Sequence, residues 1–319
     1  MASRLPRSGS CSMKFALALL SLIGFAQAAA AADFLVNETA NDAAISGTFP
    51  WAINEVGSAG EETNLITFTT AVNGQILSVT EGAPLPAIAL GASGHSVEIN
   101  AESTNGFEIN GPTEPENTFN ILDIQTGKAT LVDLKISGGE FNIQTDGILE
   151  FKDTSAYPDR EITDVIKGAG RLIKAGEQTL TLSGENSYTG GTQITGGILK
   201  GDRKGLGATN GLFQFIADAE QEDRGTLTFE DSEAEVWTWD GSTDGDGKVT
   251  KAGTSTLQLG GAASFAHTGG TELLNGSLEA QSVKLVGSDI AISQDALLKF
   301  TENAVDSNFD SAITGAGRA

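Results

Sequence analysis

The sequence predicts an all-β solenoid, a rod in which short strands stack coil upon coil. Three observations lead to this prediction: a motif that recurs at a fixed spacing, short segments of alternating apolar and polar residues, and many glycines. The chain has 319 residues, of which 40 are glycine and only 6% are aromatic. Glycines in this number, placed between short alternating segments, indicate many tight turns.

The recurring motif is the strongest of these observations. The segment Gly168-Ala-Gly-Arg-Leu-Ile-Lys-Ala-Gly176 returns 77 residues later as Gly245-Asp-Gly-Lys-Val-Thr-Lys-Ala-Gly253. Each is followed by a Thr-Leu-x-Leu segment and a Thr-Gly-Gly-Thr turn, and a third copy begins at Gly315. The copies therefore cover residues 168–202, residues 245–282 and the segment from 315 onward. A Leu-x-Phe pair precedes each of them: Leu149 and Phe151, Leu227 and Phe229, Leu298 and Phe300.

The alternating segments read as short strands. In the first copy, Thr179 to Leu182 and Gly191 to Ile194 alternate apolar and polar side chains. A unit this small cannot bury its apolar side alone, so successive coils must stack. Coils of roughly 20–25 residues with strands about 4.8 Å apart would give about a dozen coils and a rod on the order of 60 Å long. Further strands are expected at residues 96–100, 107–110, 119–124 and 130–136.

Residues 1–32 have the pattern of a secretory signal peptide. A basic start precedes an apolar run and a small-residue stretch, and cleavage is expected between Ala28 and Asp33. The apolar run is too short to span a bilayer, and no transmembrane segment is expected after it. Cys11, the single cysteine, lies in this segment, so the exported chain has no disulfide. Without the three basic residues of the signal, the net charge of −23 becomes about −26, which disfavours nucleic acid as a partner.

The repeat carries a resemblance to a known family. Residues 168–199 resemble the autotransporter-associated β-strand repeat of passenger domains, through Gly-x-Gly-x-Leu-x-Lys-x-Gly, Thr-Leu-x-Leu-x-Gly and Tyr-Thr-Gly-Gly-Thr. The second copy aligns Phe265 with Tyr188 and then inserts two residues up to His267. The resemblance implies a right-handed parallel β-helix displayed at the cell surface or outer membrane of a Gram-negative bacterium, or released outside it. It also implies a translocator barrel in a full-length version.

The region before the repeats carries a looser resemblance. The segment Gly47-Thr-Phe-Pro-Trp-Ala-Ile-Asn54 resembles the opening of pectin-lyase-like extracellular proteins, in which a short amphipathic helix caps the first coil. A cap covers strand edges that could otherwise pair with other chains. We therefore expect a cap and first coils in residues 33–140 and a repeat-bearing β-helix in residues 141–319. Without visible barrel strands, the chain is expected to be a fragment, a truncated product or a free-standing secreted relative. Apolar cap contacts are expected from Phe49, Trp51, Ile53 and Val56.

Enzymatic chemistry finds little support in the sequence. Polysaccharide cleavage needs paired carboxylates, and the best candidate is Asn142 with Asp146, although the intervening residues break the known motif. Asp123 and Asp133 could stack on neighbouring coils, but isolated carboxylates on an acidic surface are usually solvated. The two histidines, His95 and His267, form no triad pattern, and His267 is expected in a loop. The chain is therefore expected not to be an enzyme and to use no cofactor.

A weak calcium site is conceivable at Asp240, Asp244 and Asp246, three carboxylates in a glycine-rich loop. The spacing does not match an EF-hand, and an acidic turn is the simpler interpretation. Trp237 and Trp239 could offer exposed contacts, or they could pack inside the helix.

Three classes of function stay open. The first is a stalk or adhesin-like passenger that contacts a host or neighbouring-cell surface. The second is a polysaccharide-cleaving enzyme on the same scaffold. The third is an inert stalk for a domain beyond residue 319.

Overall fold

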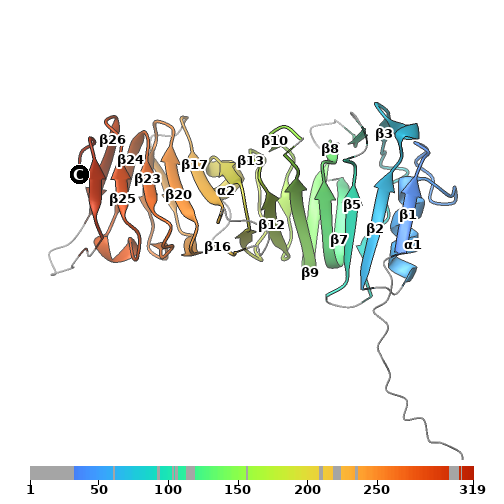
Figure 1. Ribbon diagram of the computed structural model, residues 1–319, viewed down its shortest axis with the longest axis horizontal. Helices are drawn as coiled ribbons and strands as arrows, with labels where there is room; N and C mark the ends of the chain where they lie inside the picture. The colour runs from blue at the N-terminus through green and yellow to red at the C-terminus, as the bar shows by residue number, and fades with distance from the viewer. Residues whose placement is uncertain are drawn as a thin grey trace, which may run out of the picture.

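The computed structural model describes residues 32–319, apart from residues 60–61, 92–93, 103, 105–106, 113–118, 156, 208–210, 218–223, 234–235, 302–308 and 310. The predicted signal peptide lies outside the described residues except for Ala32, the first residue of strand β1. The described chain is a rod of stacked strands that runs from the N-terminal coils at one end to the C-terminal coils at the other (Figure 1). Among the described residues, no helix is both long enough and apolar enough to cross a membrane.

The strands form parallel sheets that follow the rod axis. Within the described residues, the first sheet has 12 strands, the second 8, the third 4 and the fourth 3, and all pairings between the named strands are parallel. This arrangement confirms the predicted parallel β-helix. Strands of the first sheet, in spatial order, are β1 (Ala32–Val36), β2 (Thr63–Phe68), β5 (Ser96–Asn100), β7 (Asn120–Val132), β9 (Glu140–Asp153), β12 (Arg171–Gly176), β14 (Thr192–Ile194), β16 (Leu212–Phe215), β19 (Ser242–Gly245) and β22 (Ser264–Phe265), with β4 (Ile88–Ala89) on β7 and β11 (Ile166–Lys167) on β9.

The other sheets line the remaining faces of the rod. The second sheet contains β10 (Arg160–Ile162), β13 (Thr179–Leu182), β15 (Ile198–Gly201), β17 (Thr226–Glu230), β20 (Lys248–Ala252), β23 (Thr271–Leu273), β25 (Ile290–Ile292) and β27 (Ile313–Gly315). The third contains β18 (Val236–Trp239), β21 (Thr256–Leu259), β24 (Gly276–Ala280) and β26 (Ala296–Phe300). The fourth contains β3 (Ile76–Ser78), β6 (Glu108–Asn110) and β8 (Lys135–Ser137).

The core is a column of apolar side chains inside the coils. In β13, Leu180 and Leu182 point inward and are fully buried, while the threonines beside them are partly exposed. Leu180 is in register with Leu199 of the next coil, and Leu199 with Leu227 of the coil after it. Each coil thus adds one layer to a continuous core, and burial of these layers provides the main stabilisation of the solenoid.

The predicted capping helix is α1 (Phe49–Ala59), which packs against β1 and β4 at the N-terminal end of the rod (Figure 1). Phe49, Ile53 and Val56 are buried, as expected for the inner face of a cap. Trp51 is half-buried and lies edge-on against Phe34, with ring centroids 6.0 Å apart. Shorter helical turns occur at η1 (Thr70–Val72), α2 (Arg203–Gly207) and η2 (Ser282–Lys284).

One predicted strand is wrong. Residues 130–136 do not form a single strand, because β7 ends at Val132 and β8 begins at Lys135. Asp133 between them has a φ of 49°, the one positive value found at a non-glycine residue in the described part of the chain. The chain turns a corner there, and the alternation of residue types alone does not reveal a corner.

The two repeat copies lie on different faces of the rod. In the first copy, the Leu-x-Lys strand is β12, which belongs to the first sheet, and the following strand β13 belongs to the second. In the second copy, the corresponding strands β20 and β21 belong to the second and third sheets. The 77-residue spacing is therefore not a whole number of coils. Each copy is advanced by one face relative to the copy before it.

Candidate functional site

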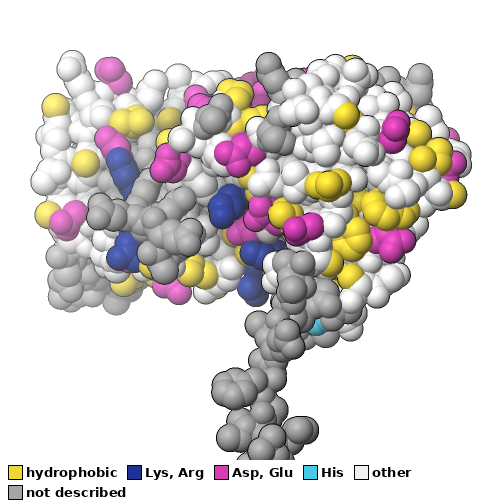
Figure 2. Space-filling model, turned by 45° about the vertical axis from the view of Figure 1, so that its right-hand side comes forward, with side chains coloured by type: hydrophobic (Ala, Val, Ile, Leu, Met, Phe, Trp, Pro, Cys, Tyr) yellow, Lys and Arg dark blue, Asp and Glu magenta, His cyan; other side chains and the backbone are white. Residues whose placement is uncertain are grey.

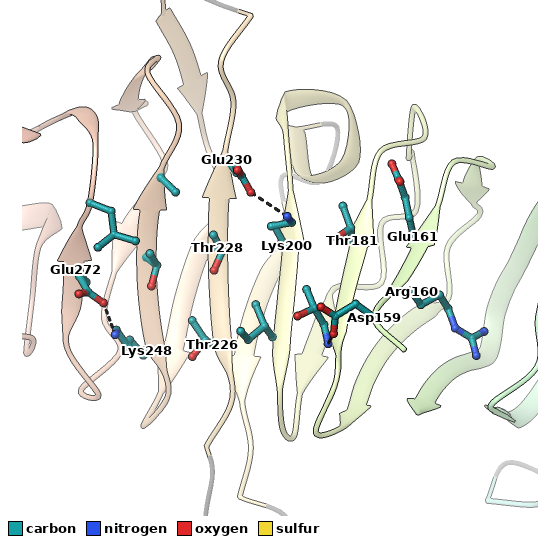
Figure 3. Close-up of a pocket in the computed structure, with 15 residues that line it drawn as sticks. Asp159, Arg160, Glu161, Thr181, Lys200, Thr226, Thr228, Glu230, Lys248 and Glu272 are labelled. Carbon is teal, nitrogen blue, oxygen red and sulfur yellow. Dashed lines mark hydrogen bonds and ion pairs between the residues drawn. The ribbon is translucent and has the colours of Figure 1, made fainter. Parts of the chain in front are cut away.

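A groove of about 630 Å³ crosses the outer face of the second sheet from β10 to β23 (Figure 3). Because side chains alternate along a strand, the groove is lined by the outward residues of six neighbouring strands. One row of register partners forms its floor: Glu161, Thr181, Lys200, Thr228, Thr250 and Glu272. With strands about 4.8 Å apart, the row is about 24 Å long.

The charged groups of the groove are already partnered within the protein. Lys200 Nζ lies 3.0 Å from Glu230 Oε2, and Lys248 pairs with Glu272 (Figure 3). The carboxylate of Asp159 accepts a hydrogen bond of 2.9 Å from the backbone amide of Thr179. The lysines neutralise Glu230 and Glu272, whereas Asp159 has only an uncharged hydrogen-bond donor as its partner.

Arg160 also borders the groove, but its guanidinium points away from it (Figure 3). The guanidinium is buried instead, where it binds the Asp153 carboxylate and the backbone carbonyl of Leu134. The next residue of β10 is Glu161, whose carboxylate accepts a hydrogen bond of 2.7 Å from the Ser183 hydroxyl.

The groove also offers hydroxyl groups that are not used inside the protein. The side chains of Thr181, Thr226, Thr228 and Thr250 make no hydrogen bond within the described part of the chain. Ile198 is 38% exposed among them. Each hydroxyl can donate one hydrogen bond and accept others. Such a floor can bind a hydroxyl-rich neutral molecule, and the carboxylates of Asp159 and Glu161, which have no cationic partner, disfavour an anionic one.

The three aspartates of the conceivable calcium site have separate contacts. Asp244 accepts a hydrogen bond of 2.8 Å from the backbone amide of Gly245, and Asp246 pairs with Arg224 at 2.9 Å. The carboxylate of Asp240 lies against Gly260 of the next coil. Across the described residues, no three acidic, histidine or cysteine side chains gather in an arrangement that could hold a metal ion.

The candidate acid–base residues are held by structural hydrogen bonds. Asp123 accepts hydrogen bonds from the side-chain amides of Asn142, at 2.7 Å, and Gln144, at 3.2 Å. Asp133 accepts bonds of 2.8 Å and 2.6 Å from the backbone amide and the hydroxyl of Thr154. The expectation that these two aspartates are solvated is therefore wrong, because both bind the neighbouring coil. Asp146 is exposed and is the register partner of Thr126.

The structure also settles where the larger side chains lie. His267 lies in the loop between β22 and β23, as expected, and is fully buried there, with Nδ1 2.8 Å from the Thr243 hydroxyl. Trp237 and Trp239 are both 1% exposed, so they pack inside the helix and offer no surface contact. His95, by contrast, is half-buried and directly precedes β5.

Sequence reasoning missed the buried lysines of the repeat. Lys174 and Lys251 are 0% and 1% exposed. A signal for this burial was available in the motif, because Leu172 faces inward and a strand has a period of two residues. Lys174, two residues later, must therefore face inward as well.

Charge on the visible surface is mixed. Figure 2 shows acidic side chains spread over one face of the rod, with the fewer basic side chains lying near them. No broad basic patch is visible on that face. Electrostatic attraction of nucleic acid would require such a patch.

Comparison with known proteins agrees with the geometry. Residues 172–200 and 249–280 match the family described as Passenger-associated-transport-repeat. The Adhesin BmaC autotransporter of Brucella suis biovar 1 (strain 1330) is 36% identical over 162 residues, which cover 47% of this chain and 4% of that relative. The chain thus spans a small part of the length of that relative. No solved structure matches the chain significantly. The chain is thus similar, over these segments, to passenger-associated repeats and to part of an autotransporter adhesin.

Proposed function

We propose that the chain is a surface-displayed, non-catalytic segment of an autotransporter passenger, with an adhesin-like role, and that the groove on its second sheet is the contact surface. The signal-peptide pattern of residues 1–32 supports export. The passenger repeats and the similarity to a relative named as an adhesin support display on a Gram-negative cell through a translocator barrel.

The observation that carries this proposal is the division between inward and outward residues in the repeat. Inward positions agree between the copies, as in the pairs Leu180 with Leu257, Lys174 with Lys251 and Leu199 with Leu278. Outward positions differ, as in the pairs Thr181 with Gln258, Ile198 with Ser277 and Lys200 with Glu279. The repeat therefore specifies the scaffold and leaves the surface free to vary, which suits a protein whose surface makes the contacts.

The groove favours a linear, neutral, hydroxyl-rich ligand such as a surface polysaccharide. Its partnered charges and unused threonine hydroxyls match uncharged donors and acceptors. The strands repeat at about 4.8 Å, close to the length of one sugar unit in an extended chain. In an extended peptide, side chains on one face are about 6.7 Å apart, so they would not match the spacing of the strands that form the groove floor.

The test is adhesion by cells that display the chain fused to a translocator barrel. The double substitution Thr181→Val and Thr228→Val removes two hydroxyls without changing side-chain shape, and Thr63→Val is the matched control on the exposed part of β2. We expect the double variant, unlike the control, to adhere roughly tenfold less to surfaces coated with a neutral linear polysaccharide.

The other functions give different results in the same assay. If deletion of residues 33–319 abolishes adhesion but the groove variants do not, the contact lies elsewhere on the chain. Unchanged adhesion after a deletion that still permits display would leave the chain as an inert stalk. Release of new sugar ends from the polysaccharide would contradict the non-catalytic part of the proposal.

A further inference from the structure

The two repeat lysines occupy the same unusual environment. Lys174 in β12 and Lys251 in β20 hold equivalent positions in the motif, and both are buried. A buried lysine is costly unless its ammonium is surrounded by acceptors or opposite charge. In both copies the ammonium donates to three backbone carbonyls, so the environment belongs to the repeat and not to one site.

The three carbonyls come from two different coils. Lys174 Nζ lies 2.7 Å from the carbonyl oxygen of Ala175 and 3.1 Å from that of Gly176, the last two residues of β12. The third carbonyl, at 3.2 Å, belongs to Gly196 between β14 and β15, on the next coil. The lysine therefore joins a corner of its own coil to the same corner of the following coil.

The second copy repeats this arrangement. Lys251 Nζ lies 2.5 Å from the carbonyl oxygen of Ala252, the last residue of β20, and 3.0 Å from that of Gly253, which follows it. Its third carbonyl belongs to Asn275 on the next coil, at 3.5 Å. Gly176 and Gly253 have φ values of 75° and 72°, so both turns use a backbone conformation that favours glycine.

An aspartate lies at each of these corners on the preceding coil. Asp153 is the register partner of Gly176 and is 1% exposed. Asp231 ends the corresponding Leu-x-Phe-x-Asp segment, and its backbone carbonyl accepts a hydrogen bond from Ser255. Burial lowers the pKa of Lys251 to about 8, and the charge of Asp231 opposes this effect. The ammonium is thus still mostly protonated at neutral pH.

The two corners lie on different edges of the rod. The carbonyls around Lys174 lie where the first sheet meets the second, at the end of β12 and between β14 and β15. Those around Lys251 lie where the second sheet meets the third, between β20 and β21 and between β23 and β24. Because the second copy begins one face further round the rod than the first, its lysine lies at the next edge of the rod.

We propose that the repeat lysine is an inter-coil clamp, which joins the last carbonyls of its own strand to a carbonyl of the following coil. Two consecutive coils then open together at each clamp. Because the copies advance by one face, the clamps fasten successive edges and resist splaying of the rod in different directions. This role is independent of the ligand contact proposed for the groove.

The substitutions Lys174→Met and Lys251→Met test the clamp, because methionine keeps most of the side-chain volume without the ammonium. Lys248→Met is the matched control, since Lys248 lies in the same strand as Lys251 but faces outward in an ion pair with Glu272. Hydrogen exchange measured by mass spectrometry on the purified chain reports the opening of each coil.

For Lys251→Met, we expect exchange to rise roughly a hundredfold or more in two coils together, at residues 248–253 and 271–276. The coils around Lys174 should keep their protection, because solenoid coils contact only their neighbours. The control should change exchange by less than about fivefold. If Lys251→Met opens only its own coil, or none, the clamp is wrong.

A measurement on the unsubstituted chain covers the case in which a variant does not fold. Amine-reactive labelling in the native state should modify Lys200 and Lys248, whose side chains are 35% and 44% exposed, and should spare Lys174 and Lys251. We expect a difference in labelling rate of roughly a hundredfold or more, which disappears in denaturant. Equal native-state labelling rates would overturn the proposal.

Discussion

Tyr188 and His267 make the same hydrogen bond in the two repeat copies. The Tyr188 hydroxyl lies 2.7 Å from the hydroxyl of Thr192, and Nε2 of His267 lies 2.9 Å from the hydroxyl of Thr271. Each is fully buried and directly precedes the Thr-Gly-Gly-Thr turn. The sequence alignment that paired Tyr188 with Phe265 is therefore wrong, and the insertion lies before the histidine. The turn fixes the position, and two different side chains fill it.

Because the second copy has a histidine where the first has a tyrosine, we expect the stability of the second copy to fall at acid pH. Burial lowers the pKa of His267 to about 4, against about 6.5 in an unfolded chain. Between these values the unfolded state binds more protons, so stability is unaffected above pH 6.5 and falls as the pH drops toward 4. We expect a loss of about 2 kcal/mol between pH 7.5 and pH 5.0 from this residue.

Urea denaturation at the two pH values measures this effect. His267→Tyr, which installs the residue of the first copy, is the control because it leaves all carboxylates in place. The loss should be about 2 kcal/mol smaller in this variant than in the unsubstituted chain. An equal loss in both proteins would show that His267 does not carry the acid sensitivity.

Two glycines of the second repeat copy differ in whether their backbone conformation and surroundings allow a side chain. Gly253 has a φ of 72°, and a Cβ there would approach the carbonyl oxygen of Asp231 to 2.5 Å. Gly261 has open space around its would-be Cβ and no positive φ. We expect Gly253→Ala to destabilise the chain by about 2 kcal/mol or more, and Gly261→Ala to be neutral or slightly stabilising. Thermal denaturation of both variants tests the difference, and equal midpoints would contradict it.

The fold was largely predictable from the sequence because its main determinants are local. Alternation placed strands at residues 96–100 and 179–182, which are the bounds of β5 and β13. Self-similarity indicated stacking, and the residues around Phe49 indicated the cap. Each of these patterns is formed by residues close together in the sequence, whose side chains pack into the same core.

The groove and the clamps could not be predicted in the same way, because they depend on coil length. Leu180 and Leu199 are register partners 19 residues apart, whereas Leu199 and Leu227 are 28 apart because a longer loop intervenes. Such loops decide which face each strand joins. Therefore the sequence did not reveal that Thr181 and Thr228 share one row, or that the second copy begins on another face.

The tryptophans give a third prediction, which concerns the core. Trp239 lies within 6 Å, centroid to centroid, of the rings of Phe213, Phe229 and Phe265. Trp239→Ala should therefore cost about 3–5 kcal/mol in unfolding free energy. Trp51→Ala, at the half-buried cap position, should cost less. Chemical denaturation compares the two variants, and a larger loss at Trp51 would contradict the burial of Trp239.

The buried ion pair between Arg160 and Asp153 gives the last prediction. The guanidinium donates to a carboxylate oxygen of Asp153 at 2.5 Å and lies 5.5 Å from the ring centre of Phe151. Burial raises the pKa of the Asp153 carboxyl, and the charge of Arg160 opposes this shift. Arg160→Met leaves the carboxylate buried without this partner, so we expect a loss of about 3 kcal/mol.

Two comparisons test whether the loss of stability in Arg160→Met comes from loss of the ion pair: one with a surface ion pair and one with a double variant. Lys299→Met breaks an exposed pair with Glu279, at 2.8 Å, and should cost less than about 1 kcal/mol. Combining Arg160→Met with Asp153→Asn removes both charges, so the double variant should be more stable than Arg160→Met alone. Simple addition of the two single losses would mean that the side chains act through packing and not through their mutual charge.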